Sequence, residues 1–548
     1  MVNKRLRNYT YLYLTSLGVT ILLYWRLFLT FYQQDEWQAL GHFSALGWKA
    51  IGENLTPLDL LLAKGRLLTV GIYDLIFTYE PYGVITISII TILLHALNGF
   101  LIFLLMQKIF KKKIISIFAS LFFLTNAVAN QAVIWSGASI AIIGSTTCVL
   151  LSMSYFLSFL ENEKYRDYIL SFLFLFISLQ FKESALAIIP FFVAFAFFLK
   201  WKILPKKFYL ISLIPLIYFI LFLTLRVGGS LASTQKVGDY VNQSHNVKVV
   251  IVANGITYFV TSVAQIFFPA DFIYPLATKF LKAEYQSLSV NPQFDLISQT
   301  VITDMINTLV SLLFLGLLFM CAICRKQLTL LWFFLGILAV TLLPYIIIQR
   351  GSSYLESRYY YLLLVPICGF LGIILTAFIK FKQKLYFIAF SVFLLLLISS
   401  YVLLDQKELI KQQNLAETRI AILHTIKQEV PSLQKKTVFY IQSDQSYILP
   451  TNPLPFQEGI GYTFLEYLHN TNSKMLDALL INNFLWDIGT QGYKTIDGYG
   501  YGLFTDKYTI ENALKEKKFT KDAIIVFYWD SKKQKLRNIT KSYHINSH

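Results

Sequence analysis

Two adjacent carboxylates, Asp35 and Glu36, follow directly after a long apolar segment that runs from Tyr9 to Phe31. A segment of this length can cross a bilayer, and a charge at the bilayer centre costs roughly 3 kcal/mol. The two carboxylates are therefore expected at the membrane boundary. There they could act as a general base toward a hydroxyl group or as ligands of a divalent metal.

The composition indicates a polytopic membrane protein. Of the 548 residues, 56% are hydrophobic and 14% are charged, which is more apolar than an ordinary soluble domain. The mean hydropathy is +0.56. The net charge of +17 is concentrated in short clusters such as Lys4–Arg7 and Lys111–Lys113, next to apolar segments, where the orientation signals of membrane proteins occur. We therefore expect no binding to nucleic acid.

Apolar windows of about 20 residues predict about eleven transmembrane helices. The basic N-terminus is expected in the cytoplasm and the C-terminus outside, in the plasma membrane of a prokaryote. The segment 249–268 is interpreted as a helix at the outer interface, because counting it as a span would place later basic clusters outside. The predicted spans are 9–31, 84–110, two between 114 and 160, two between 168 and 199, 208–225, 308–324, 328–348, 359–378 and 385–404.

This topology divides the chain into two parts. Residues 1–404 form a transmembrane domain whose outer loops are 33–83 and 226–306, and residues 405–548 have the composition of a small soluble α/β domain outside the membrane. Within the second part, apolar patterns predict two strands and two helices. The strands are expected at 437–441 and 523–528, and the helices at 408–428 and 473–483.

More charged residues fall at the predicted outer helix ends or in the outer loops, where they could converge on one cavity with Asp35. They are Arg66, Lys182, Glu183, Arg226, Glu356 and Arg358. Each could instead be an interfacial side chain that extends toward water. The Lys182-Glu183 pair lies in a turn between two very apolar spans, so it is expected to be buried and paired. His95 lies inside the second span, where either a hydrogen bond to another helix or a ligand contact would satisfy it.

Several short segments carry a resemblance to a known family. They are Asp35-Glu36, Gly65-Arg66-Leu67-Leu68-Thr69, Leu94-His95-Ala96-Leu97-Asn98, Phe181-Lys182-Glu183-Ser184 and Glu356-Ser357-Arg358-Tyr359-Tyr360-Tyr361-Leu362. In their order and sidedness they resemble the GT-C superfamily of polytopic glycosyltransferases, most closely the branch of the protein O-mannosyltransferases and the transmembrane O-mannosyltransferases. The chain departs from that pattern at Leu67-Leu68, where the family often has Pro-Leu, and at Ser357, which separates the later Glu and Arg.

The resemblance implies a GT-C-like fold and an inverting transfer of a sugar, with mannose expected, from a polyprenyl-phosphate donor in the lipid bilayer. The acceptor would be a protein, lipid or glycan on the outer face. Asp35 would be the base, and Glu36 would orient the base or the acceptor. A divalent metal on these two carboxylates is the alternative, and no other cofactor is expected. Arg358 would hold the leaving phosphate, and further candidates for substrate binding are Arg226, Arg66, Lys182, Glu183, His95, Glu356 and Tyr359.

Other classes of function stay open. A ligase or polymerase of surface polysaccharide would also use a lipid-linked sugar. A flippase or transporter of lipid-linked glycans would need substrate groups at the bilayer midplane, whereas the charges here fall on one side. A non-catalytic anchor would have no need of an acid at Asp35. In the C-terminal part, four aromatic residues could stack on sugars or belong to the core, namely Tyr462, Trp486, Tyr499 and Tyr501.

Overall fold

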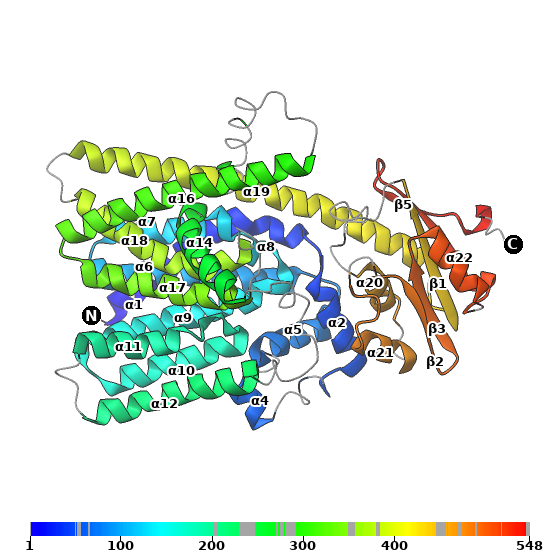
Figure 1. Cartoon of the computed structure of the whole chain (residues 1–548), viewed down its shortest axis with the longest axis horizontal. Helices are drawn as coiled ribbons and strands as arrows, with labels where there is room; N and C mark the ends of the chain where they lie inside the picture. Colours follow the sequence, from blue (N-terminus) through cyan, green and yellow to red (C-terminus); the bar gives the residue numbers. More distant parts are fainter. Residues whose placement is uncertain are drawn as a thin grey trace.

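Most of the chain folds into a bundle of long apolar helices, and one helix continues from it into a C-terminal domain (Figure 1). The structure is a computed structural model. It describes residues 2–49, 51, 56–63, 66–200, 206–228, 247–269, 272–273, 279, 292–348, 357–379, 384–444, 456, 459–469, 474–487, 490–516 and 518–543. Within these residues, nine helices are long and apolar enough to cross a membrane. The chain is therefore an integral multi-pass membrane protein.

The helices of the bundle follow the predicted spans. Of the eleven predicted spans, nine correspond to the long helices. The remaining two correspond to the shorter helices α7 (Lys113–Leu124) and α10 (Tyr165–Phe181), which have 12 and 17 residues. The long helices are α1 (Val2–Tyr24), α6 (Ile85–Phe110), α9 (Ser136–Asn162), α11 (Ile188–Lys200), α12 (Lys206–Phe222), α16 (Pro292–Cys324), α17 (Leu328–Ile348), α18 (Tyr360–Ile379) and α19 (Lys384–Glu429). The nine spans also take in the short helices that adjoin α1, α11, α12 and α18, among them η1 (Trp25–Leu29).

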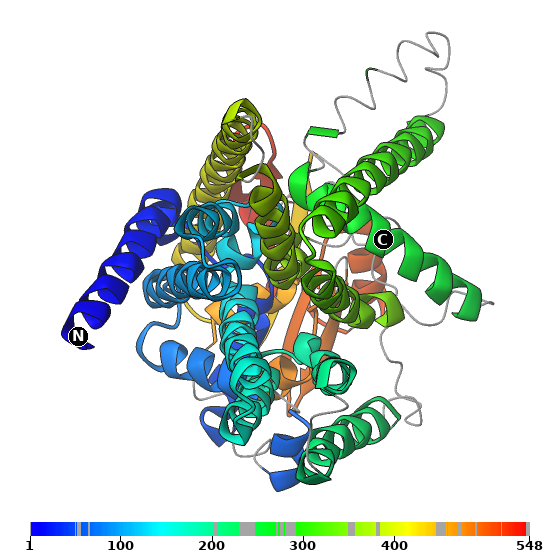
Figure 2. The ribbon, with the colours of Figure 1, turned by 90° about the vertical axis from the view of Figure 1, so that its left-hand side faces the viewer.

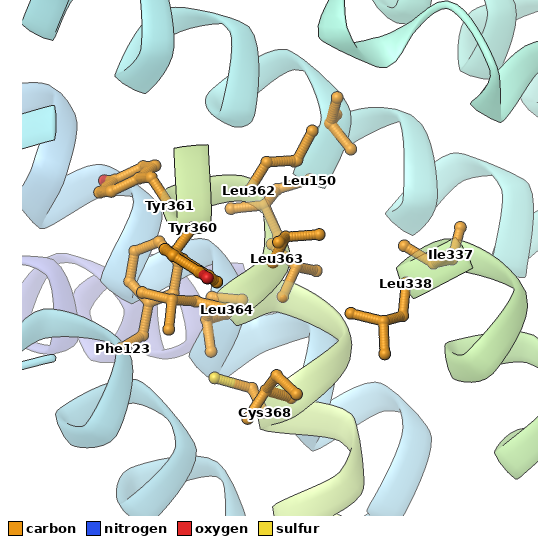
Figure 3. Close-up of a cluster of buried hydrophobic side chains, with 14 of the residues drawn as sticks. Phe123, Leu150, Ile337, Leu338, Tyr360, Tyr361, Leu362, Leu363, Leu364 and Cys368 are labelled. Carbon is orange, nitrogen blue, oxygen red and sulfur yellow. The ribbon is translucent and has the colours of Figure 1, made fainter. Parts of the chain in front are cut away.

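Helix α18 forms the centre of the bundle. Nearly all of its side chains are buried, as expected for a helix that is apolar on every face. Figure 3 shows Tyr361, Leu363 and Cys368 of α18 among side chains from neighbouring helices, including Phe123 and Ile337. When the bundle is viewed from its N-terminal end, α1 lies at the periphery (Figure 2).

Helix α14 (Val247–Phe267) covers the segment that the sequence places at the interface. In Figure 1 it runs across the direction of α16 and α17, with which it is in contact. This crosswise orientation favours the interpretation of α14 as a helix near the membrane boundary over that of a further span.

The C-terminal domain contains a five-stranded sheet with the order β2-β3-β1-β4-β5. The two predicted strands are confirmed as the neighbouring strands β1 (Lys436–Ser443) and β4 (Ile524–Asp530), which run parallel. The other strands are β3 (Tyr499–Phe504), which is parallel to β1, and the antiparallel edge strands β2 (Gly492–Ile496) and β5 (Lys535–Asn538).

Helices cover both faces of this sheet. Alternate residues of each strand point to opposite faces, so neighbouring residues pack against different helices. Phe439 and Phe527 pack with α20 (Ile460–Tyr467) and α21 (Lys474–Ile481), whereas Val438 packs with α22 (Lys507–Lys515). Helix α19 crosses the predicted boundary at 404/405 without a break. It therefore joins the bundle to the domain as one continuous element.

The helical bundle and the C-terminal domain share a hydrophobic core. Helix α2 (Asp35–Leu46) lies between the bundle and the sheet, at the end of the bundle that faces the C-terminal domain (Figure 1). Trp37 of α2 is fully buried and its ring packs against Phe456 and Tyr467. The C-terminal domain is therefore packed directly on the element that carries the two carboxylates.

Candidate active site

Glu36 is held by donors at the start of α9. Its Oε1 accepts hydrogen bonds from the Ser136 hydroxyl and, at 2.9 Å, from the Gly137 N–H. Its Oε2 accepts from Trp135 Nε1 at 3.3 Å and from the backbone N–H of Gln34 at 3.1 Å. The side chain is 1% exposed, and the N-terminus of a long helix favours a negative charge. Glu36 therefore clamps α2 onto α9 and fixes the position of its neighbour in the chain.

Asp35 is half-buried in the first turn of α2. Tyr73 of α5 (Leu67–Tyr79), whose hydroxyl donates to the Ser136 carbonyl, lies within the electrostatic reach of Glu36 and, more weakly, of Asp35. Asp35 thus lies at the junction of α2, α5 and the start of α9.

The break between α7 and α9 positions the start of α18. It contains η2 (Ala127–Ala129) and α8 (Gln131–Ile134). The Ser357 hydroxyl, in the short helix η5 (Ser357–Tyr359), donates to the Val128 carbonyl, and the Arg358 N–H donates to Gln131 Oε1 at 3.3 Å. Hydrogen bonds to this break therefore hold η5 against η2 and α8.

Arg66 and Glu183 form a bidentate ion pair. The two guanidinium nitrogens lie 2.9 and 2.7 Å from the two carboxylate oxygens, and the side chains are 40% and 34% exposed. Burial alone would lower the pKa of Arg66, but the carboxylate of Glu183 raises it above its ordinary value. Arg66 has a left-handed backbone with φ of 49°, an uncommon conformation for a residue other than glycine, which often marks a functional position.

Tyr359 brings two cations together. Lys182 Nζ lies 5.0 Å from the centre of the Tyr359 ring, and Arg358 Cζ also lies 5.0 Å from it. The Tyr345 ring of α17 packs against the Tyr359 ring at a centroid distance of 4.5 Å. Arg358 also lies over the ring of Trp135, at 4.3 Å. Aromatic faces thus hold two positive charges close to each other.

These contacts join five chain segments into one group, which we call the charged cluster. It consists of Asp35, Glu36, Arg66, Trp135, Lys182, Glu183, Arg358 and Tyr359. Two further predicted residues cannot be placed in it: Glu356 lies outside the described residues, as does the side chain of Arg226, whose backbone belongs to η4 (Leu223–Gly228). His95 is elsewhere. Its Nε2 donates to the Leu124 carbonyl at 3.2 Å, and its Nδ1 accepts from the Tyr361 hydroxyl at 2.7 Å, so it joins helices within the bundle.

The sequence interpretation did not single out Trp135 and Arg419, which face the charged cluster, or the buried Asp74. Trp135 lies between α8 and α9 and was not among the predicted site residues. Arg419 of α19 is 2% exposed and lies within the electrostatic reach of Glu36. Asp74 of α5 is buried, and burial raises its pKa to about 7. An acid within an otherwise apolar helix was the only signal that could have singled out Asp74.

The geometry does not fit a metal at Glu36. Its oxygens receive N–H and O–H donors, which stabilise an anion and do not provide ligands for a cation. In the part of the chain that the structure describes, no group of three or more His, Cys, Asp or Glu side chains forms a metal site. We therefore assign no reaction step to a metal.

The C-terminal aromatic residues belong mainly to the core. Tyr462, Trp486 and Tyr501 are buried, and only Tyr499 is substantially exposed.

Comparisons with models of protein families, with curated proteins and with solved structures found no match. The function is therefore argued from the charged cluster itself.

Proposed function

We propose that the protein is a membrane glycosyltransferase that transfers a sugar, with mannose expected, from a polyprenyl-phosphate donor to an acceptor hydroxyl. The observation that carries this proposal is the charged cluster. Segments far apart in the sequence bring a carboxylate and cations to one end of an apolar bundle, linked through Trp135. Both an activated hydroxyl and a leaving phosphate can be accommodated there.

The reaction would be a single displacement with inversion at the anomeric carbon. The acceptor oxygen forms a bond to this carbon while the bond from the carbon to the phosphate oxygen breaks. Asp35 takes the proton of the acceptor hydroxyl, a contribution that is typically worth about 10²–10⁴ in rate. The bonding electrons leave with the polyprenyl phosphate, and no other reactant is needed.

The two cations on Tyr359 suit the leaving phosphate. Arg358 and Lys182 carry charge that is partly shielded from water by aromatic rings, where it interacts more strongly with an anion than it would in bulk water. Arg66 is already neutralised by Glu183, so its role would be to position the turn that carries Lys182. This divides the predicted phosphate-binding residues into two direct partners and one support.

An apolar groove in the bundle would suit the polyprenyl chain. It has a volume of about 360 Å³ and lies between α14 and α17, with Phe259, Val340 and Ile346 among its lining residues. Ile346 follows Tyr345, which packs on Tyr359. A donor bound here would have its chain along α14 and its phosphate at Arg358.

The proposal includes a location. The charged cluster lies at the end of the bundle that faces the C-terminal domain, opposite the N-terminus (Figure 1). The basic N-terminus would be cytoplasmic, and the cluster would act at the outer face of a prokaryotic plasma membrane. The acceptor would then be a protein, a lipid or a glycan outside the cell. A flippase is less well supported, because the His95 group inside the bundle is engaged in helix contacts.

The proposal can be tested with radiolabelled sugars on polyprenyl phosphate. A panel of such donors would be added to membranes that contain the wild type or Asp35→Asn at matched expression. The expected result is transfer from one donor by the wild type and a loss of about 100-fold or more in the variant. Asp522→Asn, at an exposed site in the C-terminal domain, is the matched control and should transfer like the wild type.

Equal transfer by Asp35→Asn and by the control would contradict the role of Asp35 as base. A polymerase or ligase would be recognised by a product that carries an oligosaccharide instead of a single sugar. Failure of the wild type with every donor and a full membrane extract as acceptor would contradict the proposed class.

A further inference from the structure

Trp135 contacts both halves of the charged cluster with one side chain. Its Nε1–H donates to Glu36 Oε2 at 3.3 Å, while the face of its ring lies 4.3 Å from Arg358 Cζ. The side chain is 2% exposed. The edge of the indole therefore holds the carboxylate side, and its face holds the cation side.

The chain around Trp135 is also held by hydrogen bonds, on one side to Glu36 and on the other side to Arg358. On one side, Ser136 and Gly137 donate to Glu36, and a Cβ atom at Gly137 would lie 3.0 Å from Glu36 Cδ. A larger residue at this position would therefore force the Glu36 and Trp135 side chains to shift by a few tenths of an ångström. On the other side, the Gln131 side chain accepts from the Arg358 N–H.

The two contacts of the indole support each other. Donation of the N–H to a carboxylate polarises the ring toward greater electron density, which strengthens the attraction of the ring face for a guanidinium. In the proposed reaction the base and the phosphate-binding cation must lie on opposite sides of the sugar, so their separation determines whether a bound donor is correctly placed.

We propose that Trp135 is a positioning residue that sets the distance between Asp35 and Arg358. It does not touch the reacting atoms, and it acts through Glu36 on the base and through its ring on the cation. This inference rests on the proposed function. It explains why a bulky aromatic residue is buried in the polar break between α7 and α9.

Two variants separate the two contacts. Trp135→Phe keeps a weaker aromatic face for Arg358 and removes the N–H that reaches Glu36, so kcat should fall about tenfold while the KM for the donor rises only slightly. Trp135→Leu removes both contacts, so the donor KM should rise about tenfold and kcat should fall further. Trp332→Phe, at an exposed position on α17, is the matched control and should leave both constants unchanged.

The thermal unfolding midpoint of each purified variant is measured in parallel. A merely structural role would lower the midpoint and the amount of active protein without separating KM from kcat. Wild-type transfer with unchanged constants in both Trp135 variants would overturn the inference and leave the proposed function intact. An equal loss of kcat with an unchanged donor KM in Trp135→Phe and Trp135→Leu would also overturn the inference. Absence of transfer by the wild type with every donor would overturn the proposed function and this inference together.

Discussion

Glu466 of α20 makes the contact between α2 and the C-terminal domain dependent on pH. Its side chain is 1% exposed, and its Oε1 accepts a hydrogen bond from the Ser44 hydroxyl at 2.7 Å. Its Oε2 is buried without a hydrogen-bond partner. Burial raises the pKa of Glu466 from 4.5 to about 7, with a further increase from Asp477 that the Ser44 hydrogen bond opposes.

The direction of the effect follows from proton binding. Between pH 4.5 and about 7 the folded protein keeps the proton of Glu466, whereas the unfolded chain loses it. The stabilisation is therefore complete below pH 4.5 and is lost as the pH rises to about 7. Each pKa unit corresponds to about 1.4 kcal/mol, so the whole loss is roughly 3 kcal/mol.

Glu466→Gln should abolish this component of the pH dependence. The amide oxygen can still accept from Ser44, and no charge is buried at high pH, so the variant should be more stable than the wild type at pH 8. Unfolding can be followed by tryptophan fluorescence in detergent from pH 4 to 8, because Trp37 and Trp486 are both buried in the shared core. Glu417→Gln, at an exposed site on α19, is the control. A pH slope in Glu466→Gln equal to that of the wild type would refute the reasoning.

Three other substitutions test the packing and the charges. Gly41→Val should destabilise the domain contact by about 1–3 kcal/mol in thermal unfolding, because a Cβ atom there would lie 2.2 Å from Tyr462 Oη. Tyr361→Phe removes the hydroxyl that joins a histidine and an asparagine of α6, and should cost roughly 1–3 kcal/mol in the same assay. Glu183→Gln leaves the Arg66 guanidinium without its charged partner and should lower the transfer rate about tenfold. Unchanged stability in the first two, or unchanged transfer in the third, would contradict these assignments.

The bundle was predictable because its signals are local. Apolar length identifies nine of the eleven predicted spans, and the Lys182-Glu183 turn is observed where the sequence places it. The strands β1 and β4 are apolar runs and were found for the same reason. The hairpin of β2 and β3 was missed, although Asp497 and Gly498 have φ of 52° and 80° and form a two-residue turn that the Asp-Gly pair favours.

The contacts of the candidate site were less predictable because they are long-range. Arg66 and Glu183 are 117 residues apart, and nothing in either segment specifies the other as its partner. The dual contact of Trp135 depends on the approach of α2 and η5 to the same short break. The boundary at 404/405 was placed by a change in composition, but helical hydrogen bonding continues through it, since polar residues continue a helix as readily as apolar ones.

The measurement that tests the central claim most directly is donor binding and single-turnover transfer by the same purified preparations. The comparison uses the wild type, Asp35→Asn and Arg358→Gln with one polyprenyl-phosphate sugar. Asp35→Asn should bind the donor like the wild type and transfer about 100-fold more slowly or less. Arg358→Gln should bind it roughly 10- to 100-fold more weakly. Binding and transfer by both variants at the wild-type level would contradict the assignment of the charged cluster as the active site.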